Sequence, residues 1–207
     1  MRRTGKLLVE GRDDQHVFLS LLAHHNVPET FNVKDKKGFE KLIGELDVEH
    51  DESDLKRLGI VVDADFDLPS RWRSIKATLA NMGYALPDAP TPDGTIVTRE
   101  DGRVIGIWLM PDNNLSGMLE DFVSFLGATD DVLWALAEKC LDEVSGVNQR
   151  FIPNHRIKAH IHTWLSWQQD PGTPLGLAIT KRYFDADAPP AQRLVGWIRE
   201  LFSAQQG

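Results

Sequence analysis

Two short apolar runs that stop at acidic residues constrain the fold of this chain more than any other feature. The first run lies in KLLVEGRDD at residues 6–14 and ends at Glu10. The second lies in GIVVDADFD at residues 59–67 and ends at Asp63 and Asp65. A continuous apolar run bounded by turn residues is typical of a strand buried on both faces, as in a parallel sheet. The sequence therefore predicts an α/β fold with a mainly parallel sheet flanked by helices.

Apolar periodicity predicts alternating strands and helices before residue 87. Strands are expected at residues 5–10, 30–34 and 58–63, and helices at 12–25, 37–46 and 70–82. The acidic segment 47–54 is expected to be a loop, and Ser70 is expected to cap the third helix. This β-α-β-α-β-α order favours parallel strands joined by right-handed crossovers.

The pattern changes after a proline-rich loop at residues 87–94. The dipeptide Asp101-Gly102 favours a hairpin turn between strands at 95–98 and 104–109. A helix is expected to begin near Ser116. Later helices are expected at 129–145, 154–169 and 190–204, with a Gly/Pro break at 171–176.

The expected organisation is one α/β core followed by a helical part. The core is placed at residues 1–127, including the hairpin near 95–109, and a helical C-terminal extension at 128–207 is expected to pack on it. No apolar run approaches the ~20 residues that a membrane-spanning helix requires. Charged residues come too early at the start for a signal-peptide core. Cys140 is the single cysteine, which excludes an internal disulfide and a Cys-rich zinc site. We therefore expect a cytoplasmic protein with no membrane partner.

The distribution of charge points to a local basic surface. The net charge is −8, which argues against a protein coated in nucleic acid. Between residues 150 and 184, however, Asp170 is the only acidic residue among five cations. A basic surface beside an acidic pocket suits a phosphate-bearing substrate, although a solvated face of mixed charge explains the same pattern equally well.

The strand-end acids predict a metal site. Ligands of parallel sheets bind beyond the carboxyl ends of the strands, so Glu10, Asp63 and Asp65 are expected around one point. Because gathered carboxylates repel one another, a hard divalent cation, Mg²⁺ or Mn²⁺, is the expected stabiliser. Asp63 and Asp65 would point the same way on an extended strand. Like charges around Glu10 are expected to raise its pKa, which suits proton transfer near neutral pH. Gly11 is expected to let the backbone turn sharply and a phosphate approach.

The residues Glu10 with Gly11 and Asp63 with Asp65 resemble the Toprim signature. Toprim domains occur in type IA topoisomerases, gyrase-type enzymes, bacterial primases, small RNA-maturing nucleases and nucleases of the OLD (overcoming-lysogenisation-defect) family. The resemblance covers roughly residues 5–127 and implies a Rossmann-like core. It also implies that the strand-one glutamate transfers a proton and that the two aspartates hold Mg²⁺.

A closer resemblance is to small stand-alone bacterial Toprim-like proteins of unknown function, through MPDNNLSGMLEDF at 110–122 and GLAITKRYFDAD at 176–187. It implies a compact core with a helical cover and transfers no activity. OLD-family nucleases have further acids that support a second metal, and Glu120 is the candidate for that role. An alternative interpretation is equally good: Glu120 is an acidic residue near the start of a helix that favours the helix dipole and binds no metal.

Three further residues complete the candidates, namely Lys181, Lys158 and Asp67. Lys181, and Lys158 as second choice, are expected to face the metal and stabilise developing charge. Asp67 is either a ligand or a turn former. Asp14 is interpreted as an acid of the first helical turn that favours the helix macrodipole.

Three classes of function follow from these residues. The leading hypothesis is a Mg²⁺- or Mn²⁺-dependent nuclease, or a related phosphoryl-transfer enzyme, acting on DNA or RNA. A small-molecule phosphatase ranks below it, because the dehalogenase-type enzymes carry their acidic motif on strand one, where this chain has Glu10 and Gly11. The non-enzymatic alternative is a Toprim-like binding or regulatory module that serves a separate ATPase. That ATPase would be another chain, since the sequence has no G-x-x-x-x-G-K-[ST] motif.

Overall fold

The computed structural model describes residues 4–52, 54–127 and 130–203, and within them one five-stranded sheet has the order β2-β1-β3-β5-β4. Four of its strands are parallel, namely β1 (Gly5–Val9), β2 (Phe31–Asp35), β3 (Arg57–Asp63) and β5 (Val104–Met110). The edge strand β4 (Thr95–Thr98) is antiparallel to β5 and forms the expected hairpin. The α/β fold with a mainly parallel sheet is confirmed.

The strand register brings the ends of the central strands to one edge of the sheet. Val9 of β1 pairs with Val61 of β3, and Asp63 of β3 pairs with Met110 of β5. Because these strands are parallel, the residues that follow β1, β3 and β5 all leave the sheet on the same side. The carboxyl edge is therefore where side chains distant in the sequence meet.

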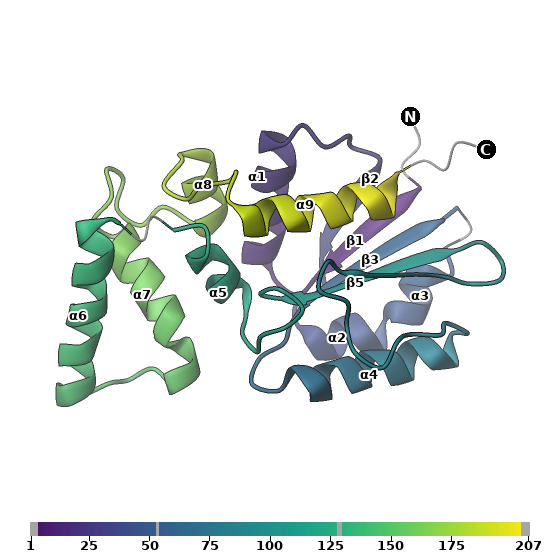
Figure 1. The fold of residues 1–207 in the computed structure, drawn as a ribbon, viewed down its shortest axis with the longest axis horizontal. Helices are drawn as coiled ribbons and strands as arrows, with labels where there is room; N and C mark the ends of the chain where they lie inside the picture. Colours follow the sequence, from purple (N-terminus) through teal and green to yellow (C-terminus); the bar gives the residue numbers. More distant parts are fainter. Residues whose placement is uncertain (1–3, 53, 128–129, 204–207) are drawn as a thin grey trace.

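Helices cover both faces of the sheet (Figure 1). One face carries α1 (Arg12–His24) and α9 (Pro189–Phe202), and the other carries α2 (Phe39–Gly44), α3 (Leu46–His50) and α4 (Leu68–Asn81). Each face has its own apolar core. Successive residues of β5 alternate between the two, so that Trp108 belongs to one core and Leu109 to the other. This double burial explains why the central strands are continuous apolar runs.

Two glycines let α9 lie close to the sheet. Gly59 and Gly106 are paired across β3 and β5. A Cβ atom on Gly106 would come within 2.6 Å of the Leu201 side chain, and one on Gly59 would come within 3.0 Å of it. The two glycines thus make a trough in the sheet that Leu201 of α9 fills.

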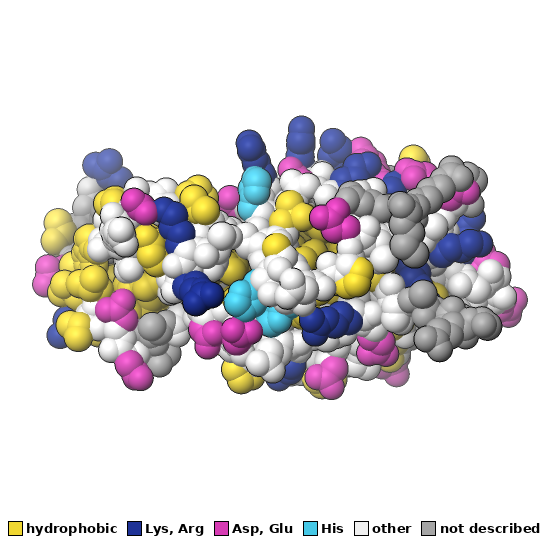
Figure 2. Space-filling model, turned by 90° about the horizontal axis from the view of Figure 1, so that it is seen from above, with side chains coloured by type: hydrophobic (Ala, Val, Ile, Leu, Met, Phe, Trp, Pro, Cys, Tyr) yellow, Lys and Arg dark blue, Asp and Glu magenta, His cyan; other side chains and the backbone are white. Residues whose placement is uncertain are grey.

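The remaining helices extend from one end of the sheet (Figure 1). They are α5 (Leu119–Ser124), α6 (Val132–Val147), α7 (Arg156–Leu165) and α8 (Leu175–Thr180), with a short 3-10 turn at Pro153–His155. Helix α8 packs against α1, and α7 packs against α5 and α6. Several apolar side chains of α6 and of the segment that follows it are exposed, namely Val132, Leu136, Val144, Val147 and Ile152. Hydrophobic surface is visible at that end of the molecule in Figure 2. The expected helical C-terminal extension is confirmed, and none of the helices in the described ranges has the length and apolar character needed to cross a bilayer.

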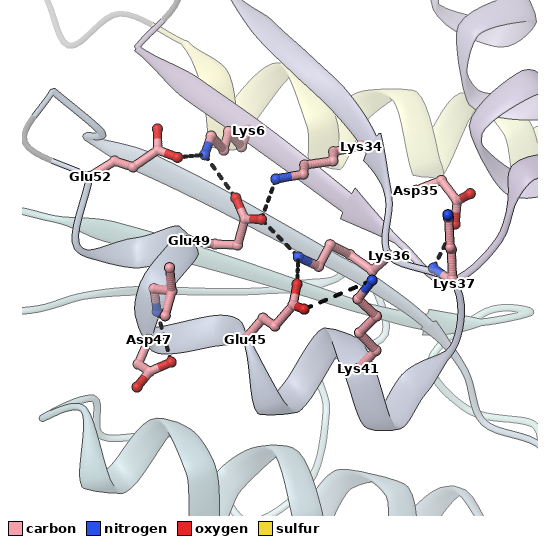
Figure 3. A network of polar contacts seen from close by, with 11 residues as sticks. Lys6, Lys34, Asp35, Lys36, Lys37, Lys41, Glu45, Asp47, Glu49 and Glu52 are labelled. Atoms are coloured by element: carbon pink, nitrogen blue, oxygen red, sulfur yellow. Dashed lines mark hydrogen bonds and ion pairs between the residues drawn. The ribbon is translucent and has the colours of Figure 1, made fainter.

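The acidic segment 47–54 was expected to be a loop, and this expectation is wrong for its first half. Residues 46–50 form α3, with Glu49 and His50 buried. Lysines of β1 and β2 compensate the acids of this region (Figure 3). The Nζ atoms of Lys6 and Lys36 lie 2.8 and 2.7 Å from carboxylate oxygens of Glu49. We call this group the lysine–glutamate network; its members are Lys6, Lys34, Lys36, Glu45, Glu49 and Glu52.

Other helix boundaries also differ from the sequence analysis. Helix α4 begins at Leu68, and its N-cap is Asp67, which accepts a hydrogen bond from the Ser70 backbone N–H at 3.0 Å. Ser70 is therefore not the cap. The helix expected near Ser116 begins at Leu119, and α8 is a short helix that the Gly/Pro break concealed.

Candidate metal centre

Glu10, Asp63 and the start of α5 meet at the carboxyl edge of the sheet. Glu10 directly follows β1, and its Oε1 accepts a hydrogen bond from the Asp63 backbone N–H at 2.9 Å. Asp63 is the last residue of β3, and its Oδ1 accepts a hydrogen bond from the Leu119 backbone N–H at 2.9 Å. The structure thus brings together acids that are 53 residues apart in the sequence.

Asp65 reaches the same place by a bent backbone. The strand ends at Asp63, and Asp65 has a φ of 51°, in the left-handed region that few non-glycine residues adopt. Its backbone N–H donates to the carbonyl oxygen of Gly117 at 2.8 Å, which fixes this conformation. The two aspartates are therefore not on one extended strand, as the sequence analysis assumed, although both line the same cavity.

That cavity, of about 350 Å³, is the acidic cavity of this protein. Its acidic lining residues are Asp13, Asp14, Asp63, Asp65 and Glu120, and its basic ones are Arg12, His155 and Lys158. Glu10 is not part of the lining, but its charge acts on both Asp14 and Asp63. The cavity gathers carboxylates from β3, α1, α5 and the loop after β3.

Asp14 is the residue of this cavity whose role the sequence analysis misjudged. Its side chain is only 7% exposed, and its Oδ1 has no hydrogen-bond partner among the described residues. A buried oxygen without a donor is costly, and a bound ligand would satisfy it. Burial raises the pKa of Asp14 to about 7, and the charges of Glu10 and Glu120 add to this rise. Asp14 is therefore more than a first-turn acid.

Asp63 has the most perturbed carboxyl group of the cavity. Burial raises its pKa to about 9, with further upward contributions from Asp14 and Glu10. Burial also raises the pKa of Glu10, and the hydrogen bond from the Asp63 backbone opposes that rise. The sequence analysis predicted this direction for Glu10, but it named neighbouring charges, whereas burial is the largest cause. Without a cation, Asp63 retains its proton near neutral pH, and Asp14 retains its proton in part of the molecules.

Two cations flank the acids. Lys158, on α7, lies 2.8 Å from Oε1 of Glu120, whose side chain is 6% exposed. Arg71, on α4, forms an ion pair with Asp65. Lys158 lines the acidic cavity, as the sequence analysis expected of its second choice. Arg71 was missed, because nothing in a single sequence indicates that residue 71 returns to the loop after β3.

Three other candidates lie differently from what was expected. Lys181 is not in the acidic cavity: it follows α8, which packs on α1, and it pairs with Asp170. Asp67 caps α4 and lines a neighbouring pocket, not the acidic cavity. Gly11 does line the cavity, but its φ of −135° is open to any residue. A Cβ atom there would lie 3.0 Å from Oδ2 of Asp14, so Gly11 provides room beside that carboxylate.

The sequence did contain a signal for Asp14. Asp14, Val17 and Leu21 have the spacing of one helical face, and all three are buried. An acidic residue within an apolar stripe is an exception to the usual pattern, and such an exception indicates a ligand or a charge partner.

Comparison with known proteins gave one match. The model of a protein family of unknown function, DUF3226, matches residues 4–203. No curated protein and no solved structure matches the chain.

Proposed function

We propose that this chain, which belongs to the DUF3226 family, is a Mg²⁺- or Mn²⁺-dependent enzyme that hydrolyses phosphodiester bonds of nucleic acid. The observation that carries the proposal is the pair of uncompensated carboxylates, Asp14 and Asp63, beside Glu10. Strongly raised pKa values in a cavity are typical of functional sites.

The residues of the acidic cavity fit a hard divalent cation. All candidate ligand atoms are carboxylate oxygens, which Mg²⁺ and Mn²⁺ prefer. Within residues 4–52, 54–127 and 130–203, ion pairs reach Glu120 and Asp65 but neither Asp14 nor Asp63. The unpartnered Oδ1 of Asp14 is a further free ligand atom. Asp63 and Asp14 would hold the ion, with Glu10 and Asp65 beside them.

The remaining residues suit phosphoryl transfer. A bound ion would neutralise phosphate charge and lower the pKa of a bound water. Burial raises the pKa of Glu10, and a raised pKa favours a role of this carboxyl group in proton exchange. Lys158 and Arg71 lie on either side of the acids and would face the negative charge of the phosphate. The resemblance of the strand-end motifs to the Toprim signature supports the same assignment.

A second candidate function is a non-catalytic binding module, which could serve a separate ATPase. The observation that favours it is that Lys158 and Arg71 already neutralise Glu120 and Asp65. Such a module would bind the metal or the nucleic acid without turnover.

The test is metal-dependent cleavage by the wild type and by Asp63→Asn. The asparagine retains an oxygen that can accept the hydrogen bond from Leu119, so the change removes the charge with little change of shape. With Mn²⁺ we expect the wild type to cleave labelled DNA or RNA, and the variant to lose at least about 100-fold. Asp88→Asn is the matched control, because Asp88 is exposed and paired with Lys76.

Two results would contradict the proposal. One is cleavage that continues in EDTA, and the other is an Asp63→Asn variant as active as Asp88→Asn. Thermal stabilisation by Mn²⁺ that depends on Asp63 but comes with no cleavage of any nucleic acid would support the binding module instead.

A further inference from the structure

A second cavity shares a wall with the acidic cavity. Its volume is about 330 Å³, and we call it the Phe66 pocket. It is lined by Phe39, Asp65, Phe66, Ser70, Arg71 and Ser74, among others. Asp65 lines both cavities. A ligand with one part in each cavity would therefore pass over this carboxylate.

The Phe66 ring is exposed on a segment that is held in place. Phe66 is 70% exposed, although it directly follows Asp65. On one side the Asp65 backbone N–H donates to Gly117, and on the other the Leu68 N–H donates to the Ser116 hydroxyl at 3.3 Å. Leu68 is itself buried. The exposed ring thus belongs to a fixed segment and lines the Phe66 pocket directly after Asp65, the residue that lines both cavities.

Another part of the pocket lining combines an aromatic ring with a planar cation. The Arg71 guanidinium lies over the Phe39 ring, 3.8 Å from its centroid, and also pairs with Asp65. Its side chain is 15% exposed. The exposed Ser70 and Ser74 lie one turn apart on α4 and can donate or accept hydrogen bonds. Aromatic faces, a guanidinium and hydroxyl groups are the set of groups that binds a heterocyclic base.

We propose that the Phe66 pocket binds the base of one nucleotide, stacked on Phe66, while the phosphate of that nucleotide lies at Asp63 and Asp65. The position of the phosphate rests on the proposed function. Stacking on a side chain requires a base that is free of its neighbours, so the ligand is a single strand, an unpaired end or a free nucleotide.

The experiment compares oligonucleotides with and without bases. Fluorescence anisotropy in Mg²⁺ would measure the binding of a phosphorothioate-linked ten-thymidine strand, which resists cleavage, and of an abasic strand of equal length. We expect the wild type to bind the thymidine strand more tightly. Phe66→Ala should weaken that binding roughly 5- to 100-fold and leave the abasic strand unchanged. Phe66→Tyr should retain the preference, and Leu136→Ala, which shortens an exposed apolar side chain of α6, should behave as wild type.

The outcomes separate this inference from the proposed function. Equal binding of both strands by the wild type, or unchanged binding by a folded Phe66→Ala variant, overturns the base pocket even if cleavage is observed. A base preference that depends on Phe66 supports the pocket even if no metal-dependent cleavage is found. Thymidine monophosphate that displaces the strand from the wild type, but not from Phe66→Ala, supports a pocket that accepts a free nucleotide.

Discussion

The carboxyl groups of Glu49 and Asp63 have opposite electrostatic surroundings within one sheet. Glu49 contacts three lysines, which lower its pKa to about 2 against the effect of burial (Figure 3). Asp63 has acids around it instead, and burial raises its pKa to about 9. Glu49 belongs to the lysine–glutamate network and Asp63 to the acidic cavity, and in both places the fold gathers several acids beside the sheet.

The difference lies in which charges the fold itself supplies. In the lysine–glutamate network, each acid pairs with at least one lysine from β1, from β2 or from position 36 directly after β2, so the charged state is the stable one. In the acidic cavity, Asp14 and Asp63 have no such partner within the described ranges. A compensated cluster contributes to stability, whereas an uncompensated one costs stability until a cation binds. This contrast identifies the acidic cavity, and not the more strongly acidic segment around α3, as the functional candidate.

The largest stability effect should come from the lysine–glutamate network. Glu49→Gln would remove the buried partner of Lys36, which is only 3% exposed, and leave it with the more exposed Glu45 alone. Breaking a buried ion pair costs about 3 kcal/mol or more, and urea unfolding would measure it. Glu52→Gln removes a partner that is 57% exposed and should cost under about 1 kcal/mol. If both variants lost the same free energy of unfolding, the burial of Glu49 would not make its ion pairs more stabilising than those of the exposed Glu52.

The next effect is a dependence of stability on pH. It has one sign for the acids of the acidic cavity and the opposite sign for Glu49 of the lysine–glutamate network. Asp14 and Asp63 have folded pKa values of about 7 and about 9, above the value of about 3.9 in an unfolded chain. The folded state then binds more protons than the unfolded state, so the metal-free protein should lose stability as the pH rises from about 4 to 9. The pKa of Glu49 is lowered to about 2, so its contribution is present above about pH 4.5 and is lost as the pH falls.

Thermal melts between pH 5 and 9 would measure the alkaline loss. Asp63→Asn should flatten it, and Mg²⁺ should stabilise the wild type more at pH 8.5 than at pH 6, because metal binding releases protons. A metal-free protein whose stability is the same at pH 6 and pH 9 would contradict the uncompensated character of the acidic cavity.

The smallest effect concerns Asp67, which lies next to the acidic cavity without lining it. Asp67→Ala removes the N-cap of α4 and should cost about 1 kcal/mol of stability. Asp67→Asn should restore it, since the asparagine side chain also caps helices. Neither variant should change the thermal stabilisation of the protein by Mn²⁺, and a large loss of that stabilisation in both would make Asp67 a metal ligand.

Local sequence signals predicted the sheet and the meeting of its strand ends. Apolar runs that stop at Glu10 and Asp63 predict two buried parallel strands, and parallel strands share a carboxyl edge. Residues placed by tertiary packing could not be predicted in this way. Lys181 depends on how α8 packs, and Arg71 on how α4 returns towards Asp65.

The misreading of α3 has the same origin. A run of acids looks solvated when only its neighbours in the sequence are considered. The lysines that compensate these acids come from β1 and β2, as much as 46 residues away.

The trough formed by Gly59 and Gly106 has a consequence for how the protein is made. Its occupant, Leu201, belongs to α9, which begins at Pro189, whereas the last strand, β5, ends at Met110. During synthesis the strands leave the ribosome well before α9 does, and until then the face of the sheet that α1 and α9 share is covered only in part. A segment translated after all five strands thus completes the hydrophobic core, and a chain cut short before α9 would expose that face to aggregation.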